Sequence, residues 1–524
     1  MTPSSTTSLR RAAMLAALLP ALLLPSVALA DPTPRPGALH GEVSTLARGV
    51  THERITLGDP GARADWTLQV TLPSGREGVA DSPVSSAAIA AEATARLREA
   101  GLDARSEEVV ADELEDAGGP LGERVRVGSY ATEAEAARAR GAVTEAGYPA
   151  AVWYEGWDGD APAPEEGGGP VAVNVLTVDP ARFRGEVDAT FGADLERTET
   201  TSELAAGALA GVNGGFFVFG AQHGAPGDPA GAAAYDGEVL SESVGDRPAL
   251  VLDGRRGRAA VERLTWSGRL SHGLRGLDLD GIDRVPGLIR NCGGTDDLPT
   301  STPQHDVTCT DADELVAFTE EFGASTPEGE GLEVVLDAHG RVRDVLERRG
   351  TSLGRGERSV QATGAEVAPL RELAEGARRL RLTSELADPS GRRLPMTPST
   401  QVISGGPNLV SDGSREVTAA RDGMALPANP GQFYGWVHQR NPRTIAGVDA
   451  RGRLVLVTVD GRQTDSVGMS ISEAADLALD LGLVDAVNLD GGGSTTMVVG
   501  DELVSTPSGG QERAVGDALV IRGR

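Results

Sequence analysis

The sequence predicts an α+β protein in which a small βαβ-βαβ domain precedes a large domain with a mixed sheet. Two observations lead to this prediction: an internal repeat near the N-terminus, and a long C-terminal part in which strand and turn signals alternate with few helical patterns. The chain has 524 residues, which is enough for more than one domain. We expect a signal peptide (1–30), an N-terminal segment (31–62), the small domain (63–157), a linker (158–170) and the large domain (171–524).

The small domain is predicted from a repeated hexapeptide. The run EAGLDA at 99–104 returns as EAGYPA at 145–150. Each copy follows a strand and a helical pattern, at 66–72 and 86–100 in the first half and at 124–130 and 132–146 in the second. The run RVRVGSY followed by TEAEA in the second half resembles SPOR domains, which bind peptidoglycan glycan strands. The resemblance implies peptidoglycan as a partner; a spacer domain without a ligand is the alternative.

The N-terminus has the pattern of a secretory signal. Arg10 and Arg11 precede an apolar stretch over 12–24, and Ala28 and Ala30 satisfy the small-residue rule of a cleavage site. The apolar stretch is shorter than the ~20 residues that a membrane span needs, and no later segment is long and apolar enough. We expect an exported protein, secreted or associated with the cell envelope, with no membrane span after signal removal.

Composition excludes several kinds of chemistry. All 48 basic residues are Arg, so mechanisms that need a lysine amine are excluded. A formal net charge of −29, without a basic patch, predicts no nucleic-acid partner. The seven histidines lack metal-ligand spacing, so we predict no metal site. No cofactor is indicated, and a requirement for a divalent cation stays open.

Two cysteines, Cys292 and Cys309, lie in a polar segment rich in Gly, Asp, Thr and Pro. In an oxidising compartment outside the cytoplasm such a pair is expected to form a disulfide. Two free buried thiols are the alternative.

The most informative motif lies near the C-terminus. Asp490, three glycines (491–493), Ser494 and Thr495 directly follow an apolar strand pattern. Glycines permit positive φ and leave backbone N–H groups uncovered, so such a loop can curl around an anion. The chain resumes as a strand at 497–499, so the layout is strand–loop–strand and differs from a dinucleotide-binding loop.

A second carboxylate, Asp460, ends the strand pattern at 453–459. A helix pattern over 471–481 and a strand over 484–489 follow. A right-handed parallel crossover would bring Asp460 and Asp490 to the same sheet edge, where two carboxylates could flank a glycosidic bond. An intervening strand would separate them further, and an ordinary Asp-Gly turn is the alternative for Asp460.

Other candidate residues have a structural alternative. Glu473 forms a capping-box pattern with Ser470, which would serve only to start the helix. Arg443 could clamp a phosphate or could be a solvated surface charge. Asn213, in a Gly-rich turn, could orient a substrate oxygen or satisfy the turn.

Taken in order, these motifs resemble the phosphodiester glycosidase family. The residues that carry the resemblance are 213–217, 404–406, 443–447, 460–462, 470–473 and 488–496, and the resemblance covers roughly 171–524. It implies hydrolysis of the bond between a sugar anomeric carbon and a phosphodiester oxygen. The N-terminal domain and the segment 254–400 depart from the family's animal members, which leaves the acceptor side of the substrate open.

The resemblance assigns roles to these residues. Asp490 is the expected nucleophile or charge stabiliser, with Asp460 or Glu473 as acid/base. The expected substrate-binding residues are Asn213, Gly214, Ser404, Arg443, Thr444, Arg462, Gly491, Gly492, Gly493, Ser494 and Thr495, of which Arg443, Ser494 and Thr495 would hold the phosphate.

We therefore expect an exported hydrolase that cleaves a sugar-1-phosphodiester, such as an N-acetylglucosamine-1-phosphodiester, in a cell-envelope or extracellular glycan. One alternative is a non-catalytic protein that binds envelope glycan. Another is an exopolysaccharide assembly factor that transfers a sugar phosphate. The small domain is expected to be a targeting module. Its removal should leave hydrolysis of a small soluble substrate by the large domain intact.

The mature protein is expected to begin at Asp31, because Ala28 and Ala30 precede it with the spacing of a signal cleavage site. The intact mass of secreted protein checks this prediction. A secreted fraction that retains residues 1–30 would contradict it.

Overall fold

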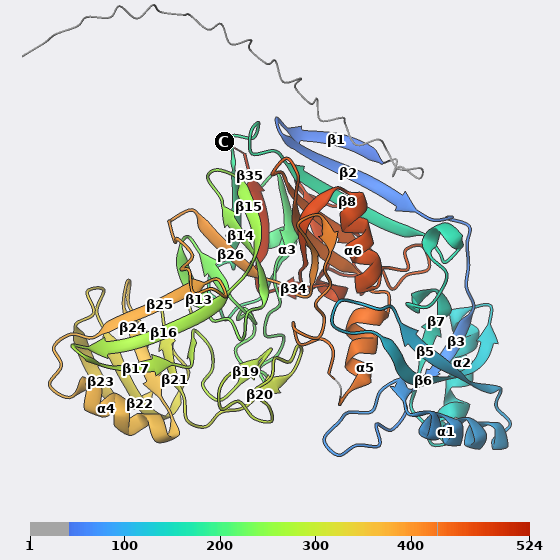
Figure 1. The fold of residues 1–524 in the computed structure, drawn as a ribbon, viewed down its shortest axis with the longest axis horizontal. Helices are drawn as coiled ribbons and strands as arrows, with labels where there is room; N and C mark the ends of the chain where they lie inside the picture. The colour runs from blue at the N-terminus through green and yellow to red at the C-terminus, as the bar shows by residue number, and fades with distance from the viewer. Residues whose placement is uncertain (1–40, 427, 524) are drawn as a thin grey trace, which may run out of the picture. The chain divides into compact units, whose positions relative to one another are not determined.

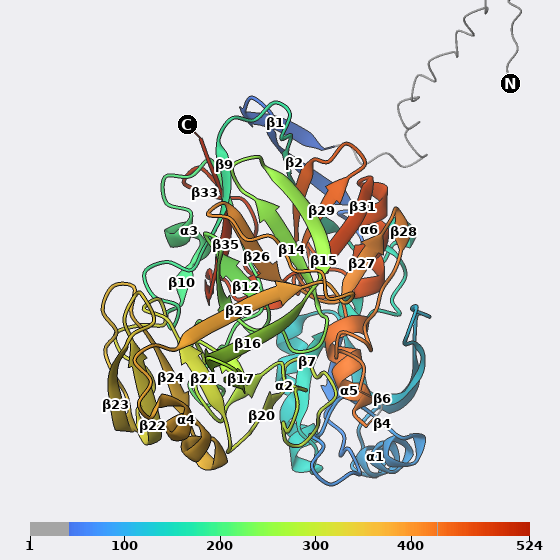
Figure 2. The same ribbon diagram turned by 60° about the vertical axis from the view of Figure 1, so that its left-hand side comes forward.

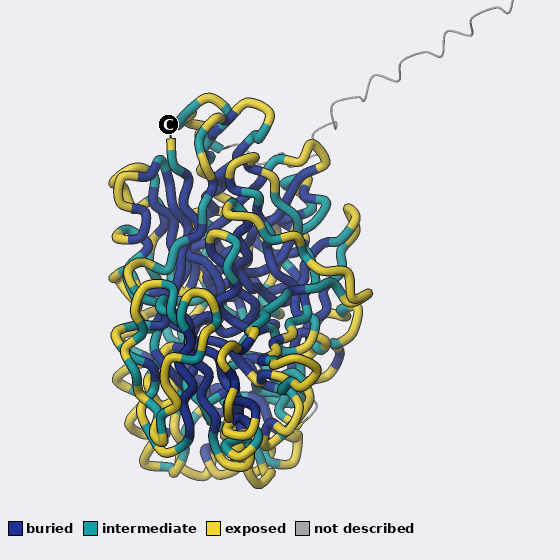
Figure 3. The backbone as a smooth tube through the Cα atoms, turned by 90° about the vertical axis from the view of Figure 1, so that its left-hand side faces the viewer, coloured by how far each residue is buried: buried dark blue, intermediate teal, exposed yellow. Residues whose placement is uncertain are grey.

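The computed structural model describes residues 41–426 and 428–523, so the predicted signal peptide lies outside the described residues. Strand accounts for 40% of the described residues and helix for 14%, which makes the fold mostly β with some helices instead of the expected α+β balance. The buried segments run through the interior of the molecule, and the exposed segments lie at its periphery (Figure 3).

The largest sheet has eight strands, in the order β1-β2-β8-β30-β29-β31-β27-β28. Their bounds are β1 (Glu42–Ala47), β2 (Val50–Leu57), β8 (Val171–Val178), β27 (Asn408–Ser411), β28 (Ser414–Arg415), β29 (Arg443–Asp449), β30 (Leu454–Val459) and β31 (Leu483–Asn488). Every neighbouring pair is antiparallel, so the prediction of a large mixed sheet is wrong. Among the described residues, parallel pairing occurs only between β18 (Gly281–Ile282) and β21 (Leu315–Phe318).

The reason lies in the predicted crossover. Helix α6 (Ile471–Asp480) does connect β30 to β31, and these two strands point the same way. However, β29 forms a hairpin with β30 and pairs with β31 on its other edge. The strand before the crossover thus inserts between the two parallel strands and turns both contacts antiparallel.

Two five-stranded antiparallel sheets pack near the large sheet. The first has the order β33-β32-β11-β35-β9, with bounds Glu502–Leu503, Met497–Val499, Ala210–Asn213, Ala518–Arg522 and Glu186–Thr190. The second has the order β13-β12-β26-β14-β15, with bounds Glu238–Ser241, Ala233–Tyr235, Thr400–Ser404, Pro248–Asp253 and Arg258–Arg263. One core joins all three sheets, because Leu456, Leu519 and Leu250 belong to the same buried cluster.

Residues between 265 and 387 form a region with its own core, which lies at the lower left in Figure 2. Its strands are β16 (Thr265–His272), β17 (Arg275–Leu279), β18, β21, β22 (Gly329–Leu336), β23 (Val342–Arg349), β24 (Arg358–Ala362) and β25 (Arg381–Ala387). Helix α4 (Val367–Ala374) packs against this core. Smaller elements are β10 (Glu199–Thr200), α3 (Thr201–Leu204), β19 (Ile289–Arg290), β20 (Thr308–Cys309) and β34 (Ala514–Val515). The predicted disulfide between Cys292 and Cys309 is confirmed.

The predicted βαβ-βαβ arrangement is present between residues 66 and 154. It consists of β3 (Trp66–Val70), β4 (Val84–Ser85), α1 (Ala87–Glu99), β5 (Ala104–Ala111), β6 (Gly119–Tyr130), α2 (Glu133–Glu145) and β7 (Ala150–Tyr154). The long strands lie in the order β5-β6-β3-β7, all antiparallel, which is the arrangement of a split βαβ sheet. Leu68 and Val125 face α1 and α2 in a common core. We call residues 66–154 the inserted module.

The module is inserted within the large sheet. Strand β2, which precedes it, pairs with β8, which follows it, and Leu57 lies opposite Val171 in this pair (Figure 1). The segment 31–62 therefore contributes two strands to the sheet that carries the C-terminal motifs, although the sequence placed it outside that domain.

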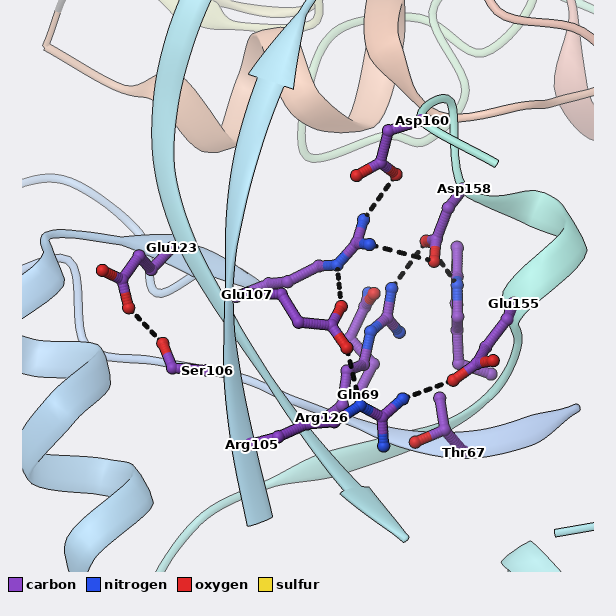
Figure 4. A network of polar contacts seen from close by, with 12 residues as sticks. Thr67, Gln69, Arg105, Ser106, Glu107, Glu123, Arg126, Glu155, Asp158 and Asp160 are labelled. Carbon is purple, nitrogen blue, oxygen red and sulfur yellow. Dashed lines mark hydrogen bonds and ion pairs between the residues drawn. The ribbon is translucent and has the colours of Figure 1, made fainter. Parts of the chain in front are cut away.

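The second face of the module's sheet is polar and covered. Side chains alternate along a strand, so Arg124 and Arg126 lie opposite to Val125. Arg126 donates to Asp158 at 2.6 Å, and Arg124 donates to Asp160 at 2.8 Å, within the ion-pair network of Figure 4. Tyr434, at the start of a π-helical turn (Tyr434–His438) that follows α5 (Pro430–Phe433), closes this face by donating to Gln69.

Arg440 fastens the predicted linker to the large sheet. Its guanidinium is fully buried and donates to the carbonyl oxygens of Gly156, Pro162 and Gly168. It also donates to Glu473 at 2.6 Å. The linker therefore runs along the protein instead of separating two independent bodies.

Arg440→Ala is expected to lower the free energy of unfolding by about 3 kcal/mol or more, because a broken buried ion pair leaves Glu473 and several carbonyls without their donor. Urea unfolding and limited proteolysis within 158–170 measure this effect. Arg138→Ala is the control, since Arg138 is an exposed residue of α2 and its loss should change stability by less than about 0.5 kcal/mol. An unchanged unfolding midpoint for Arg440→Ala would contradict the prediction.

Candidate functional site

A cleft of about 880 Å³ lies where the inserted module meets the C-terminal part of the chain. From the module and its continuation come Asp81, Ser82, Trp153 and Trp157. From the C-terminal part come Trp436, Gln439, Asn441, Arg443, Arg462, Asn488, Asp490, Gly491, Gly492, Gly493 and Arg513. The cleft therefore contains the glycine-rich motif that the sequence singled out.

The motif leaves β31 and turns back into β32. Asp490 follows the strand end, and Gly492 adopts φ +60°, a conformation that an L side chain rarely takes. The Gly492 N–H donates to Pro442 O at 2.9 Å, so this amide is committed to holding the loop. The glycines also allow close approach: a Cβ at Gly493 would lie 2.4 Å from a guanidinium nitrogen of Arg513.

Asn213 holds this loop in place. Its amide Nδ2 donates to Asp490 O at 2.7 Å, and its Oδ1 accepts from the Thr496 N–H and from the Thr444 hydroxyl. Gly214 O accepts from the Asp490 N–H. Asn213, Gly214 and Thr444 thus lie beside the motif as buried supports behind the loop, and they are not part of the cleft lining. Their contact with substrate stays a prediction.

The Asp490 carboxyl group is buried, and burial raises its pKa to about 6. Ser494 and Arg513 oppose this rise, while the nearby Asp517 adds to it. The Ser494 hydroxyl lowers the pKa of Asp490 as a nearby dipole, because its buried oxygen makes no hydrogen bond. Asp517 accepts from the Gly215 N–H and from the Tyr235 hydroxyl, so it is anchored below the motif.

Arg443 lines the cleft, but its donors are committed elsewhere. It donates to the carbonyl oxygens of Met469, Trp436 and Gln439. Burial, together with the charge of Arg462, lowers its pKa to about 9. These contacts give Arg443 a structural role that the sequence did not foresee.

Arg462 and Arg513 are the cations that reach the solvent-filled part of the cleft. Both side chains are exposed. Arg462 donates to Asn441 Oδ1 at 3.0 Å, and Arg513 stacks over Phe219 with its guanidinium carbon 5.2 Å from the ring centroid. The pKa of Arg462 is lowered by desolvation and by Arg513, and the charge of Asp490 opposes this. The two guanidinium groups lie against the loop that Asp490 begins, that of Arg462 beside Gly492 and that of Arg513 beside Gly493.

The two acid/base candidates lie outside the cleft lining. Asp460 sits at the same sheet edge as Asp490, with β29 between them, and its Oδ2 accepts from the Thr506 N–H at 2.9 Å. Burial raises the pKa of Asp460 to about 6. Glu473 forms the capping box with Ser470 and pairs with Arg440, as its structural alternative predicted.

The remaining predicted residues are buried around the motif. Ser404, Ser494 and Thr495 do not line the cleft, and Ser404 Oγ has no hydrogen-bond partner. Sequence reasoning missed Arg513 and Trp436. Arg513 follows a loop of turn-forming residues without a pattern of its own, so no local signal marks it. Asn488 belongs to the quoted motif and lines the cleft, and its buried Oδ1 has no hydrogen-bond partner.

Within the described residues, the one cluster with metal-ligand proximity is Cys292, Asp297 and Cys309, and its two cysteines are joined in the disulfide. No helix in the described part of the chain is long and apolar enough to cross a membrane.

The C-terminal region of the chain is similar to a known protein family. Residues 333–522 match the family model described as phosphodiester glycosidase. The N-acetylglucosamine-1-phosphodiester alpha-N-acetylglucosaminidase of Bos taurus is 38% identical over 112 residues, 21% of this chain and 21% of that protein. The chain thus matches only about a fifth of the length of this relative.

Solved structures extend the comparison to the whole described fold. A protein of Burkholderia pseudomallei K96243, described as exported, is 33% identical over 94% of this chain and 98% of its own, with a TM-score of 0.80. A hypothetical protein from Synechocystis shares the fold at a TM-score of 0.50 and 16% identity, over 92% of this chain and 75% of its own. The motif, its cleft and the family match agree, and the C-terminal region of this chain is therefore a domain of the phosphodiester glycosidase family.

Proposed function

We propose that this chain is an exported hydrolase that cleaves the glycosidic bond of a sugar-1-phosphodiester, such as an N-acetylglucosamine-1-phosphodiester, in a cell-envelope or extracellular glycan. The observation that carries the proposal is a buried carboxylate, Asp490, that shares one cleft with Arg462 and Arg513. The family match, the disulfide and the exported relative support the same reading.

The arrangement suits departure of a phosphodiester. The bond from the anomeric carbon to the phosphate oxygen breaks, the electron pair leaves with the phosphate, and water supplies the new sugar hydroxyl. The departing phosphate is a weak base and needs no proton from a general acid. The protein must therefore stabilise positive charge at the anomeric carbon and negative charge on the phosphate.

Asp490 would perform the first task as nucleophile or charge stabiliser. With a pKa of about 6 it is mostly ionised at neutral pH and becomes neutral in acid. Arg462 and Arg513 would stabilise the negative charge on the phosphate, because their guanidinium groups line the cleft. The guanidinium of Arg443 instead donates to backbone carbonyl oxygens. Asp460 and Glu473 would act as structural groups, since neither lines the cleft.

Two alternative functions make different predictions. A non-catalytic glycan-binding protein would turn over no sugar-1-phosphodiester. An assembly factor would transfer the sugar or sugar phosphate to an acceptor. A panel of sugar-1-phosphodiesters, assayed with and without a sugar acceptor, tests all three: free sugar and a phosphomonoester as products support hydrolysis, no turnover supports binding, and an acceptor-linked product supports transfer.

Asp490→Asn is expected to reduce kcat by at least about a hundredfold, because loss of charge stabilisation worth several kcal/mol costs about tenfold for each 1.4 kcal/mol. Wild-type kcat should fall as pH drops through about 6, when Asp490 becomes protonated. Asp485→Asn is the control, because Asp485 lies on the same strand and outside the cleft. A folded Asp490→Asn protein with more than about a tenth of wild-type kcat would contradict the assignment.

The same substitution has an expected effect on stability. A carboxyl group with a raised folded pKa binds its proton more tightly in the folded state, so it costs stability as pH rises from about 4 to about 6. Asp490→Asn should therefore be as stable as wild type at pH 8, or more stable by up to about 3 kcal/mol. Thermal melts at pH 4 and pH 8 measure the difference.

Arg513→Gln is expected to lower kcat/KM by about tenfold or more without changing the melting temperature, since an exposed side chain loses one charge-assisted contact to phosphate. Arg443→Gln should instead lower the melting temperature, because three backbone carbonyl oxygens lose their donor. The comparison of kinetics with melts separates these roles. Loss of stability in Arg513→Gln, or an unchanged kcat/KM, would count against a phosphate contact.

A further inference from the structure

The cleft that holds Asp490 is walled on one side by the inserted module. Trp153 lies on β7 and Trp157 follows it, and both line the cleft together with Trp436 from the π-helical turn. Three of the five tryptophans of a chain with only 3% aromatic residues therefore gather in one cleft. Such a concentration next to a candidate catalytic carboxylate indicates a binding surface.

The tryptophan rings are held rigidly. Trp157 meets Trp66, Trp153 and Tyr154 with ring centroids 5.5, 5.4 and 5.7 Å apart. Its indole N–H donates to Gln463 O in the C-terminal part of the chain. The Trp153 indole N–H donates to Asp158, the partner of Arg126 in the network of Figure 4. Because the rings are already ordered, a ligand that stacks on them has little side-chain entropy to overcome.

Three residues that line the same cleft carry unpaired polar atoms. Gln439 Nε2, Gln432 Oε1 and Asn488 Oδ1 belong to cleft residues, are buried and have no hydrogen-bond partner. A buried amide left without a partner costs about 1–3 kcal/mol. A ligand hydroxyl or amide toward which one of these side chains turns would remove that cost. The set includes one donor and two acceptors, and none carries charge.

This combination of indole rings and neutral amides fits sugar rings. A pyranose presents apolar C–H faces to an aromatic plane and hydroxyl groups at its edge, and aromatic residues with a few placed polar groups are the usual lining of such sites. The volume of about 880 Å³ lies near the upper end of the ~300–1,000 Å³ of small-molecule sites. The cleft therefore has room for more than the sugar phosphate beside Asp490.

We propose that Trp153, Trp157 and Trp436 form a glycan-binding subsite, so that the preferred substrate is a sugar-1-phosphodiester attached to an oligosaccharide. The inference rests on the proposed function and specifies its substrate class. The inserted module then belongs to the substrate site, in contrast to the separable targeting role expected from the sequence. Its sheet supports this assignment, because one face packs on α1 and α2 and the other is closed by the ion-pair network and Tyr434.

The test compares a monosaccharide-1-phosphodiester with one that carries at least two further sugar rings. Wild type should show a lower KM for the longer substrate. Trp157→Ala and Trp436→Ala should each raise that KM by about fivefold to tenfold and raise the KM for the short substrate by a smaller factor, so that the preference for the longer substrate is lost. Tyr148→Ala is the matched control, since Tyr148 is an aromatic residue of the module that does not line the cleft. Equal effects on both substrates, or on neither, would overturn the proposal.

A second measurement is independent of turnover and of variant folding. Titration of wild-type protein with a neutral N-acetylglucosamine trimer, followed by tryptophan fluorescence and calorimetry, should show saturable binding. Trp157→Phe, which keeps an aromatic ring, should retain most of it. Trimer binding without turnover of any phosphodiester would overturn the proposed hydrolase and leave the subsite. Turnover without a preference for chain length and without trimer binding would overturn the subsite alone.

Discussion

The buried guanidinium of Arg440 is the contact on which the geometry of the cleft depends. It joins three parts of the chain: the linker carbonyl oxygens, the first turn of α6 through Glu473, and the segment that leads into β29. Glu473 also caps α6, so helix position and module position are set by one polar cluster. Since every member is hydrogen-bonded, the cost of burying the charge is offset. This cluster holds the side of the cleft that contains Trp157 in place against the strand end that contains Asp490.

The site is built at a cost in stability. Asp490 and Asp517 are both buried acids, and burial raises the pKa of each to about 6. The negative charge of Asp517 adds to the rise at Asp490. The surrounding structure tolerates this because Asn213, Gly215 and Tyr235 hold the backbone and the second carboxylate in place. Because Asp490 is buried, little water screens its charge. A charge that is not screened by water interacts more strongly with the positive charge that develops in the reaction.

Much of the local structure could be predicted from the sequence, because period and caps act over short distances. The helices of the module, α6 with its capping box and the strand that ends at Asp490 were all predicted, as was the disulfide. Contacts between segments far apart in the sequence could not be predicted. No local sequence pattern shows that β29 lies between β30 and β31, or that Arg443 donates its hydrogen bonds to carbonyl oxygens. For the same reason the sequence favoured Arg443 over Arg513, since only the first lies in a motif.

The pairing of Leu57 with Val171 has a consequence for how the chain folds during synthesis. Strand β2 emerges early, and its partner β8 follows only after the whole module. If the module between β2 and β8 were still a flexible chain, bringing these two strands together would cost considerable entropy. Until β8 arrives, β2 is an unpaired strand that can pair with a wrong partner. If the module condenses first, its two ends come together and the remaining step resembles formation of a simple hairpin. The module would then act as an internal scaffold for assembly of the sheet, and a slow-folding module would leave β1 and β2 open to aggregation.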